Sequence, residues 1–109
     1  MPAFFIVRAE VDNASVRDAF DRWYDSEHLP DALKAFNARR AWRGWSAVNA
    51  SVHYAYYEFD SMALALAIPG SAALARLVAE FDRVWEGKVT RTRDVVEVMQ
   101  CLEGGAKTA

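Results

Sequence analysis

The chain has 109 residues, enough for one domain that buries roughly two thirds of its unfolded surface. Hydrophobic residues make up 53% and aromatic residues 13%, which excludes a disordered chain. The formal net charge of −2 provides no overall attraction to nucleic acids or acidic membranes, so neither is expected as a partner.

The sequence also indicates in which cellular compartment the protein is expected. Cys101 is the single cysteine, so no disulfide can form within the chain, which fits a reducing compartment. The apolar residues 4–7 are too few for a signal-peptide core and are followed by Arg8. No run approaches the ~18 apolar residues of a membrane span. The expectation is a cytoplasmic domain with no membrane association.

The first third of the chain predicts a strand and two helices. Residues 3–11 carry apolar side chains on both faces at the start, as in a buried strand. Residues 15–28 then place apolar side chains at helical spacing. Pro30 disfavours helical geometry in the residue before it, so this helix is expected to end near His28. A second short helix then runs through Phe36.

The rest of the chain predicts two strands, two helices and a last strand. Strands are expected at 37–48 and 52–59, separated by a short turn. A short helix is expected at 61–68. A longer one follows, with a clean apolar stripe over 74–85. The β-branched residues of 92–102 predict the final strand.

The predicted order is β-α-β-β-α-β, the arrangement of ferredoxin-like folds in the α+β class. It gives a four-stranded antiparallel sheet with two helices on one face. Residues 1–103 are expected to form this single domain, and 104–109 a flexible C-terminal tail. Cys101, at the end of the last strand, is expected to be a small buried side chain.

Both faces of the predicted sheet carry apolar or aromatic side chains. A contiguous apolar sheet face is larger than a soluble monomer usually exposes. We therefore expect a homodimer through the sheet face, with two-fold symmetry and ~800 Å² or more buried per partner. A cavity between the sheet and the helix ends would then be the natural site for a small hydrophobic or aromatic ligand.

Three sequence blocks carry a resemblance to a known family. They are Arg22-Trp-Tyr-Asp-Ser-Glu-His-Leu-Pro30, Ala38-Arg-Arg40 and Tyr57-Glu-Phe-Asp-Ser61. With these blocks in this order, the first half of the chain resembles the dimeric α+β barrel superfamily. Within that superfamily it resembles the EthD-like proteins associated with ether-degradation gene clusters. The resemblance implies a dimeric α+β barrel with a small cavity in each barrel, near Tyr24 and His28.

The resemblance implies no particular reaction. The superfamily includes oxygenases, isomerases, cyclases, haem enzymes and many proteins without an assigned activity. The second half of the chain matches only in its pattern of elements. Fold alone does not determine function, which depends on the side chains of the site.

His28 is the main candidate for catalysis, as a group that moves a proton. It follows Phe20 and Tyr24 at steps of four residues, a row that drifts about 40° per step around a helix. His28 is therefore expected at the margin of the buried stripe. The negative helix end and Asp25 or Glu27 would favour a protonated ring there. The structural alternative is a histidine that caps the helix end.

Tyr24 is the second catalytic candidate, because its hydroxyl lies one turn before His28. It would orient the imidazole or hydrogen-bond a ligand oxygen. Equally, it would serve as a core aromatic whose hydroxyl reaches water. Trp23, on the same aromatic side of the helix, is expected to contribute to ligand binding.

Three further residues are candidates for ligand binding. Arg40 and Trp42 share a strand face, and an inward arginine beside aromatic rings would hold a carboxylate or enolate. The alternative is a rim arginine paired with an acidic residue. His53 would form a second polar pole opposite His28 if its strand face lines the cavity. If that face instead meets the helices, His53 is a core histidine with its hydrogen bonds satisfied.

Metal, cofactor and nucleic-acid sites are not expected. Two histidines on separate elements, without a third ligand at a recognisable spacing, make a weak metal case. The sequence contains no phosphate-binding loop or nucleophile elbow. Four tryptophans near arginines would suit base stacking, but the acidic balance and the lack of an RNA-binding signature argue against it.

Two functions of different classes remain. The first is an enzyme without a metal that acts on an apolar or aromatic carbonyl compound, lactone or phenol. It would work as an isomerase, lyase, cyclase or cofactor-free oxygenase, with His28 moving the proton. The second is a noncatalytic homodimer that binds a small ligand or acts in a stress response.

Overall fold

The computed structural model describes residues 1–105 and has nine helical or strand elements. In chain order they are β1 (Ala3–Glu10), α1 (Ala14–Trp23), η1 (Tyr24–His28), α2 (Leu29–Phe36), β2 (Arg40–Trp45), β3 (Val52–Phe59), α3 (Met62–Leu66), α4 (Ala72–Trp85) and β4 (Thr90–Glu97).

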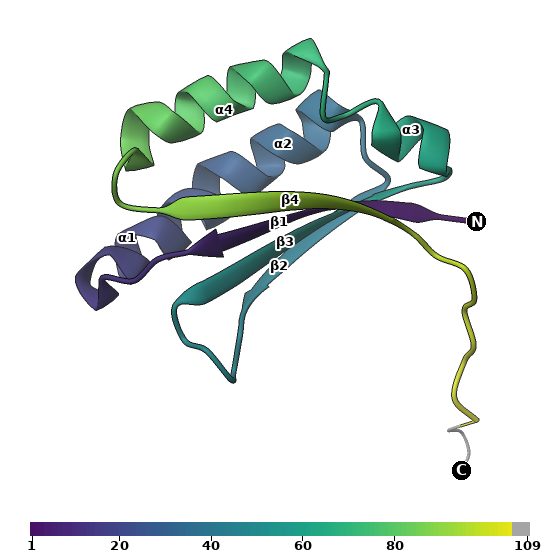
Figure 1. Cartoon of the computed structure of the whole chain (residues 1–109), viewed down its shortest axis with the longest axis horizontal. Coiled ribbons are helices and arrows are strands. Elements are labelled where there is room, and N and C mark those ends of the chain that lie inside the picture. The colour runs from purple at the N-terminus through teal and green to yellow at the C-terminus, as the bar shows by residue number, and fades with distance from the viewer. Residues whose placement is uncertain (106–109) are drawn as a thin grey trace.

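The four strands form one sheet in the order β2-β3-β1-β4, and every neighbouring pair is antiparallel. This order and the βαββαβ sequence of elements are those of a ferredoxin-like α+β fold, which confirms the predicted fold class. The helices lie together on one side of the sheet (Figure 1).

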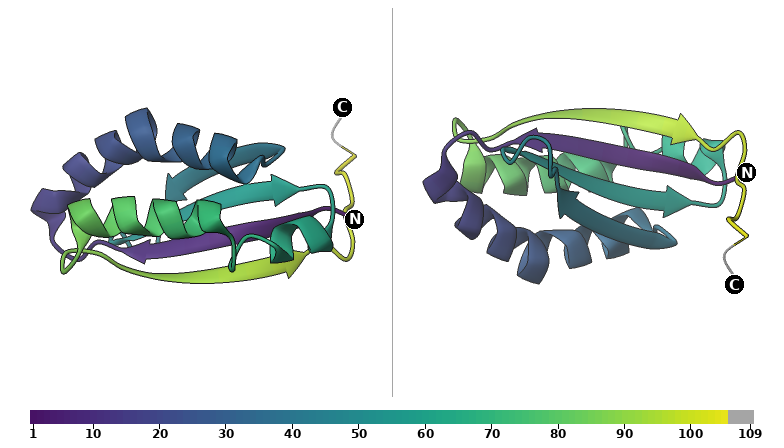
Figure 2. Two further views of the ribbon diagram at one scale, coloured as in Figure 1. Left: turned by 90° about the horizontal axis from the view of Figure 1, so that it is seen from above. Right: turned by 90° about the horizontal axis from the view of Figure 1, so that it is seen from below.

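The sheet has one covered face and one open face. The views from above and below show α1, α2 and α4 over one face, whereas the strands lie in front when the other face is viewed (Figure 2). The register sets which side chains share a face: Phe5 pairs with Tyr57 and lies on the helix side. Phe4 pairs with Glu58 on the opposite, open face.

The helix does not stop at His28, so the predicted break before Pro30 is wrong. Leu29 has helical dihedrals (φ −64°, ψ −46°), and α1, η1 and α2 follow one another without a loop. Residues Tyr24–His28 form a π turn, in which the Leu29 N–H donates to the Tyr24 carbonyl. Proline lacks an N–H. The chain therefore remains helical because the wider turn shifts the hydrogen-bond register just before Pro30.

The last strand is shorter than predicted. β1 begins at Ala3, which pairs with Glu97, so the residues that follow Glu97 have no partner on β1 and do not extend the strand. Cys101 consequently lies past the strand and is exposed, and the prediction of a buried cysteine is wrong. The predicted tail at 104–109 stays a prediction, because residues 106–109 lie outside the described residues.

Phe20 on α1 is the centre of the aromatic core, and none of its surface is exposed. Its ring lies 5.3 Å from the ring centroids of Tyr24, His53 and Trp85. It also contacts Trp23, Trp45 and Phe81. Phe20 therefore connects two helices of the helix layer with strands β2 and β3 of the sheet.

We expect Phe20→Ala to lower the free energy of unfolding by about 3–5 kcal/mol, because it leaves a cavity among rings that cannot fully collapse. Urea unfolding followed by near-ultraviolet circular dichroism measures the loss. Val48→Ala is the control, since Val48 is 100% exposed and its truncation should change stability by less than about 0.5 kcal/mol. A small effect of Phe20→Ala would contradict this role of Phe20.

Candidate functional site

Two buried histidines meet one tyrosine between the helices and the sheet. His28 comes from η1 and His53 from β3, and their ring centroids lie 4.7 Å and 4.5 Å from that of Tyr24. All three side chains are buried. We call Tyr24, His28 and His53 the His–Tyr–His cluster. The π turn places both Tyr24 and His28 on the buried side of the helix.

His28 is enclosed by aromatic rings. Its imidazole stacks on Trp23 at 4.6 Å with an interplanar angle of 18°, and Phe81 lies 5.7 Å away. Burial lowers the pKa of His28 to about 4, with the Asp31 carboxylate opposing this effect. The ring is therefore neutral near pH 7, and the expectation of a protonated His28 is wrong because desolvation outweighs the nearby carboxylates.

One ring nitrogen of His53 has a hydrogen-bond partner and the other has none. Its Nε2 lies 3.3 Å from Nη1 of Arg43. Its Nδ1 is buried without a hydrogen-bond partner. Burial and then the Arg43 charge lower the pKa of His53 to about 4. Both imidazoles of the cluster are thus uncharged at neutral pH.

Arg43 on β2 is held against the cluster by Asp21 of α1. Arg43 Nη1 donates to Asp21 Oδ1 over 2.8 Å, and Trp45 Nε1 donates to the same oxygen over 2.8 Å. Both hydrogen bonds lower the pKa of Asp21, and the bond from Arg43 has the larger effect. The Arg43 guanidinium also lies 5.7 Å from the centroid of the Tyr24 ring. Arg43 thereby places a fixed positive charge beside the rings of Tyr24 and His53.

Strand β4 contributes two more arginines on the helix side. The Arg91 guanidinium lies 3.9 Å from the centroid of the Phe81 ring and pairs with Asp82 at 2.8 Å. Burial and then the Arg91 charge lower the pKa of Arg93. No carboxylate among residues 1–105 forms an ion pair with Arg93. The site therefore has a positively charged side that is not fully balanced.

Tyr24 keeps its proton at neutral pH. Burial raises the pKa of its hydroxyl to about 12, and a hydrogen bond from Tyr57 opposes that rise only in part. Both hydroxyls are on the helix side of the sheet, inside the core. Tyr24 is therefore available as a neutral hydrogen-bonding group and not as a base.

The structure separates the ligand-binding candidates into two groups. Trp23 and His53 lie with Tyr24 and His28, as described above. Arg40 and Trp42 lie on the open face, where the Arg40 guanidinium is 5.4 Å from the Trp42 ring centroid and its Nε pairs with Glu58 at 2.6 Å. Trp42 is 39% exposed. The strand pattern showed that Arg40 and Trp42 share a face but not which face.

Sequence reasoning missed five members of the site, which are Asp21, Arg43, Trp45, Arg91 and Arg93. The signal for Arg43 was present, because it alternates with Arg40 and so had to lie on the opposite face. Arg91 and Arg93 lie in the second half of the chain, where no motif marked them.

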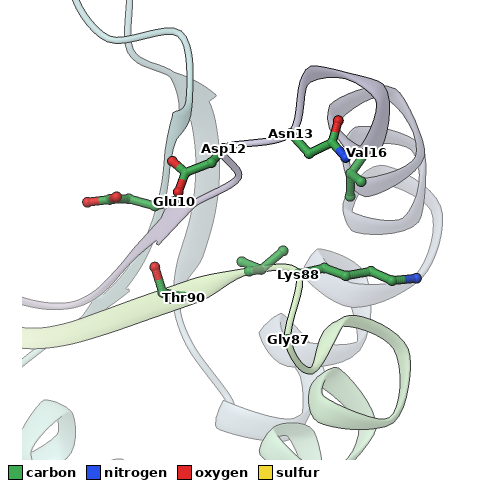
Figure 3. A pocket seen from close by; sticks show the side chains of 8 residues that line it. Glu10, Asp12, Asn13, Val16, Gly87, Lys88 and Thr90 are labelled. Carbon is green, nitrogen blue, oxygen red and sulfur yellow. The ribbon is translucent and has the colours of Figure 1, made fainter.

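Two hollows lie elsewhere on the molecule. One, of about 380 Å³, is at the end of the sheet between the β1–α1 and α4–β4 connections (Figure 3). The other, of about 300 Å³, is on the open face. The first is lined by Glu10, Asp12, Asn13, Val16, Gly87, Lys88, Val89 and Thr90. Neither hollow is lined by a residue of the His–Tyr–His cluster.

Residues 1–105 contain neither a metal-binding cluster nor a membrane-spanning helix. No group of three or more His, Cys, Asp or Glu side chains in that range is arranged to hold a metal ion. No helix in the same range is long and apolar enough to cross a bilayer.

Comparison with solved structures places the fold. An EthD family protein from Bacillus halodurans superimposes with a TM-score of 0.68 at 15% identity, covering 91% of this chain and 100% of the other. HapK from Hahella chejuensis superimposes with a TM-score of 0.65 at 15% identity, covering 94% of this chain and 99% of the other. SnoaB, a cofactor-independent oxygenase from Streptomyces nogalater, superimposes with a TM-score of 0.62 at 10% identity, covering 94% of this chain and 98% of the other.

No family model and no curated protein matches the sequence. At such low identities the likeness concerns the fold. The chain has the ferredoxin-like α+β fold that EthD family, cofactor-independent oxygenase and NIPSNAP-type structures share, as the sequence resemblance predicted.

The two lowered histidine pKa values predict a pH-dependent stability. Each pKa falls from 6.5 to about 4 on folding, so between these values the unfolded chain binds more protons than the folded one. Their stabilisation is complete above pH ~6.5 and is lost as the pH falls toward 4. We expect a loss of about 2 kcal/mol per histidine between pH 7 and pH 5, measured by urea unfolding.

His28→Gln is the matched variant for this measurement, because it removes one of the two titrating rings. Its pH-dependent loss should be about half that of the parent chain. A parent protein whose stability is the same at both pH values would show that the histidines are not buried as neutral rings.

Proposed function

We propose that the protein is an enzyme for a small apolar or aromatic carbonyl compound, with His28 as the group that moves a proton. The observation that supports this most is the His–Tyr–His cluster, in which two uncharged imidazoles from different elements contact one tyrosine ring. A core needs no such pair of imidazoles for packing, and buried titratable groups with shifted pKa values concentrate at functional sites.

His28 would act as the proton acceptor. It is neutral at pH 7, so its free nitrogen is ready to take a proton without first losing one. A conjugate-acid pKa of about 4 makes it a weak base. Its substrate should therefore carry an acidic hydrogen, such as a C–H next to a carbonyl or a phenol O–H. The C–H or O–H electrons stay on the substrate as an enolate or phenolate.

The positive side of the site would stabilise that anion. Arg43, Arg91 and Arg93 all face the helix layer, whereas Arg40 lies on the opposite face and is removed from this role. The rings of Trp23 and Phe81 around His28 favour an aromatic or apolar substrate body. Return of the proton to another atom gives an isomer. Expulsion of a leaving group from the next carbon, which takes its bonding electrons with it, instead gives a lyase product. Attack of the enolate carbon on a second carbonyl of the same molecule gives a cyclic product.

We propose that the open face joins two copies of this chain. Phe4, Trp42, Tyr56 and Tyr54 form a row of rings across it, with successive centroids 5.5, 5.8 and 6.1 Å apart. The arginines on this face are paired with carboxylates, Arg8 with Glu10 and Arg40 with Glu58. No row of like charges would therefore repel a second copy laid across the rings.

Noncatalytic binding of a small ligand is the second candidate. The hollow of about 300 Å³ on the open face favours it, because Tyr54, Tyr56 and Ile6 line that hollow together with Arg8. Binding there would not involve His28, which lies on the other face of the sheet. The two functions therefore differ in whether His28 is needed.

We expect His28→Gln to abolish proton removal while the chain remains folded. The assay follows exchange of α-hydrogens for deuterium in D2O by proton NMR, over a panel of aryl ketones and lactones. A general base typically contributes 10²–10⁴-fold, so exchange should fall by roughly 100-fold or more. The control is Glu27→Gln, an exposed neighbour on the same π turn, which should exchange at the parent rate.

Exchange by His28→Gln at the parent rate would contradict the proposed chemistry. A variant with a normal near-ultraviolet spectrum and no exchange supports it. Absence of exchange by the parent chain on the whole panel would favour the binding protein instead.

We expect the parent chain to sediment at twice its 12.2 kDa mass at micromolar concentration, and Trp42→Glu to sediment as a single chain. The new carboxylate would replace the Trp42 ring opposite Tyr56, and pairing of two copies would then require its removal from water in the proposed interface. Val48→Glu, at a fully exposed position, is the control and should remain paired. A monomeric parent chain would contradict the proposed pairing.

A further inference from the structure

The interior holds a polar nitrogen that has no partner. Within the described part of the chain, two buried side-chain nitrogen or oxygen atoms lack a hydrogen bond, His53 Nδ1 and Trp85 Nε1. Buried polar atoms are nearly always paired, so an unpaired one needs a reason. His53 Nδ1 belongs to a ring with no exposed surface, in contact with Tyr24 and Phe20.

Arg43 determines which nitrogen of His53 carries the proton. A guanidinium can only donate hydrogen bonds and stays charged in proteins. Its Nη1 lies 3.3 Å from His53 Nε2, so that nitrogen has to be the acceptor. A neutral imidazole with an accepting Nε2 carries its hydrogen on Nδ1. The unpaired atom is consequently an N–H donor.

The arginine is itself held in place from another element. Asp21 Oδ1 accepts from Arg43 Nη1 and from Trp45 Nε1, both at 2.8 Å. Asp21 belongs to α1, whereas Arg43 and Trp45 belong to β2. The second N–H of Nη1 remains for His53. Arg43 is thus a positioning residue, and the hydrogen-bond chain Asp21–Arg43–His53 spans from the helix layer to the central strand β3.

Resting on the proposed function, we propose that His53, held as the Nδ1–H tautomer by Arg43, donates to the oxygen of the bound substrate. As His28 takes the proton from the adjacent carbon, the C–H electrons form a C=C bond. The carbonyl π electrons move to oxygen, which accepts from His53 Nδ1–H. The reverse movement returns the proton, so atoms and charges balance.

This assignment narrows the substrate class. The substrate needs a carbonyl group bonded directly to the carbon that carries the acidic hydrogen, as in a ketone, a lactone or an ester. A neutral donor suits this oxygen because it binds the developing anion and does not give up its own proton first. A hydrocarbon of the same shape would leave the Nδ1–H unpaired and is selected against.

The tautomer is tested on the intact protein with labelled histidine. NMR spectra that correlate the carbon-bound ring protons of histidine with the ring nitrogens two bonds away distinguish a protonated nitrogen from an unprotonated one. The chain has two histidines, so the spectrum of His28→Gln identifies the His53 signals. We expect Nδ1 protonated and Nε2 unprotonated in the parent chain and in Arg43→Lys. In Arg43→Met the preference should weaken.

An Nε2–H tautomer or a charged ring in the parent chain at neutral pH would overturn the assignment. The same tautomer in Arg43→Met would overturn the role of Arg43. Arg43→Lys keeps a donor and a charge, so it maintains the test if the methionine variant does not fold.

The donor role is tested with acetophenone and α-methylstyrene, which differ only in C=O against C=CH2. We expect acetophenone to shift the His53 Nδ1 signal and its proton, and α-methylstyrene to leave them unchanged. Equal shifts, or no shift with acetophenone up to its solubility, would overturn the proposal. His28→Gln should retain the acetophenone shift while losing exchange, so failure of this inference and failure of the proposed chemistry can be told apart.

Discussion

Burial of two imidazoles in an aromatic core is the constraint on which the rest of the site depends. His28 and His53 come from different elements and are enclosed by rings that provide no counter-charge. Desolvation is the largest effect on both pKa values. The rings are therefore neutral at physiological pH, which leaves nitrogen lone pairs and N–H groups free for hydrogen bonding and proton transfer. A charged histidine in either place would require a buried carboxylate partner.

The two faces of the sheet divide the molecule's chemistry. The helix side holds the His–Tyr–His cluster and the arginines that surround it. The open side holds a row of aromatic rings whose arginines are already paired with carboxylates. Alternation along each strand sends neighbouring residues to opposite faces, so Arg43 and Trp42 serve different surfaces although they are adjacent. The same strand β2 thus contributes to the site and to the proposed pairing surface.

The element pattern was sufficient to predict the fold and the aromatic environment of Tyr24 and His28. It failed where the outcome depends on three-dimensional context. The π turn was not foreseen, because Pro30 indicates a helix break and the sequence does not mark the wider turn that accommodates it. Arg40 was expected near the ligand, since alternation defines two faces without saying which is covered. The role of Arg43 depends on Asp21, a partner 22 residues away in sequence.

The most direct test of the account is an NMR titration of the ring protons of His28 and His53. The account predicts that neither ring gains a proton as the pH is lowered from 8 to 5.5, because both pKa values lie near 4. A midpoint near the ordinary histidine value of about 6.5 for either ring would contradict it. Such a ring would be solvated, and it could not belong to a buried, neutral proton-transfer site.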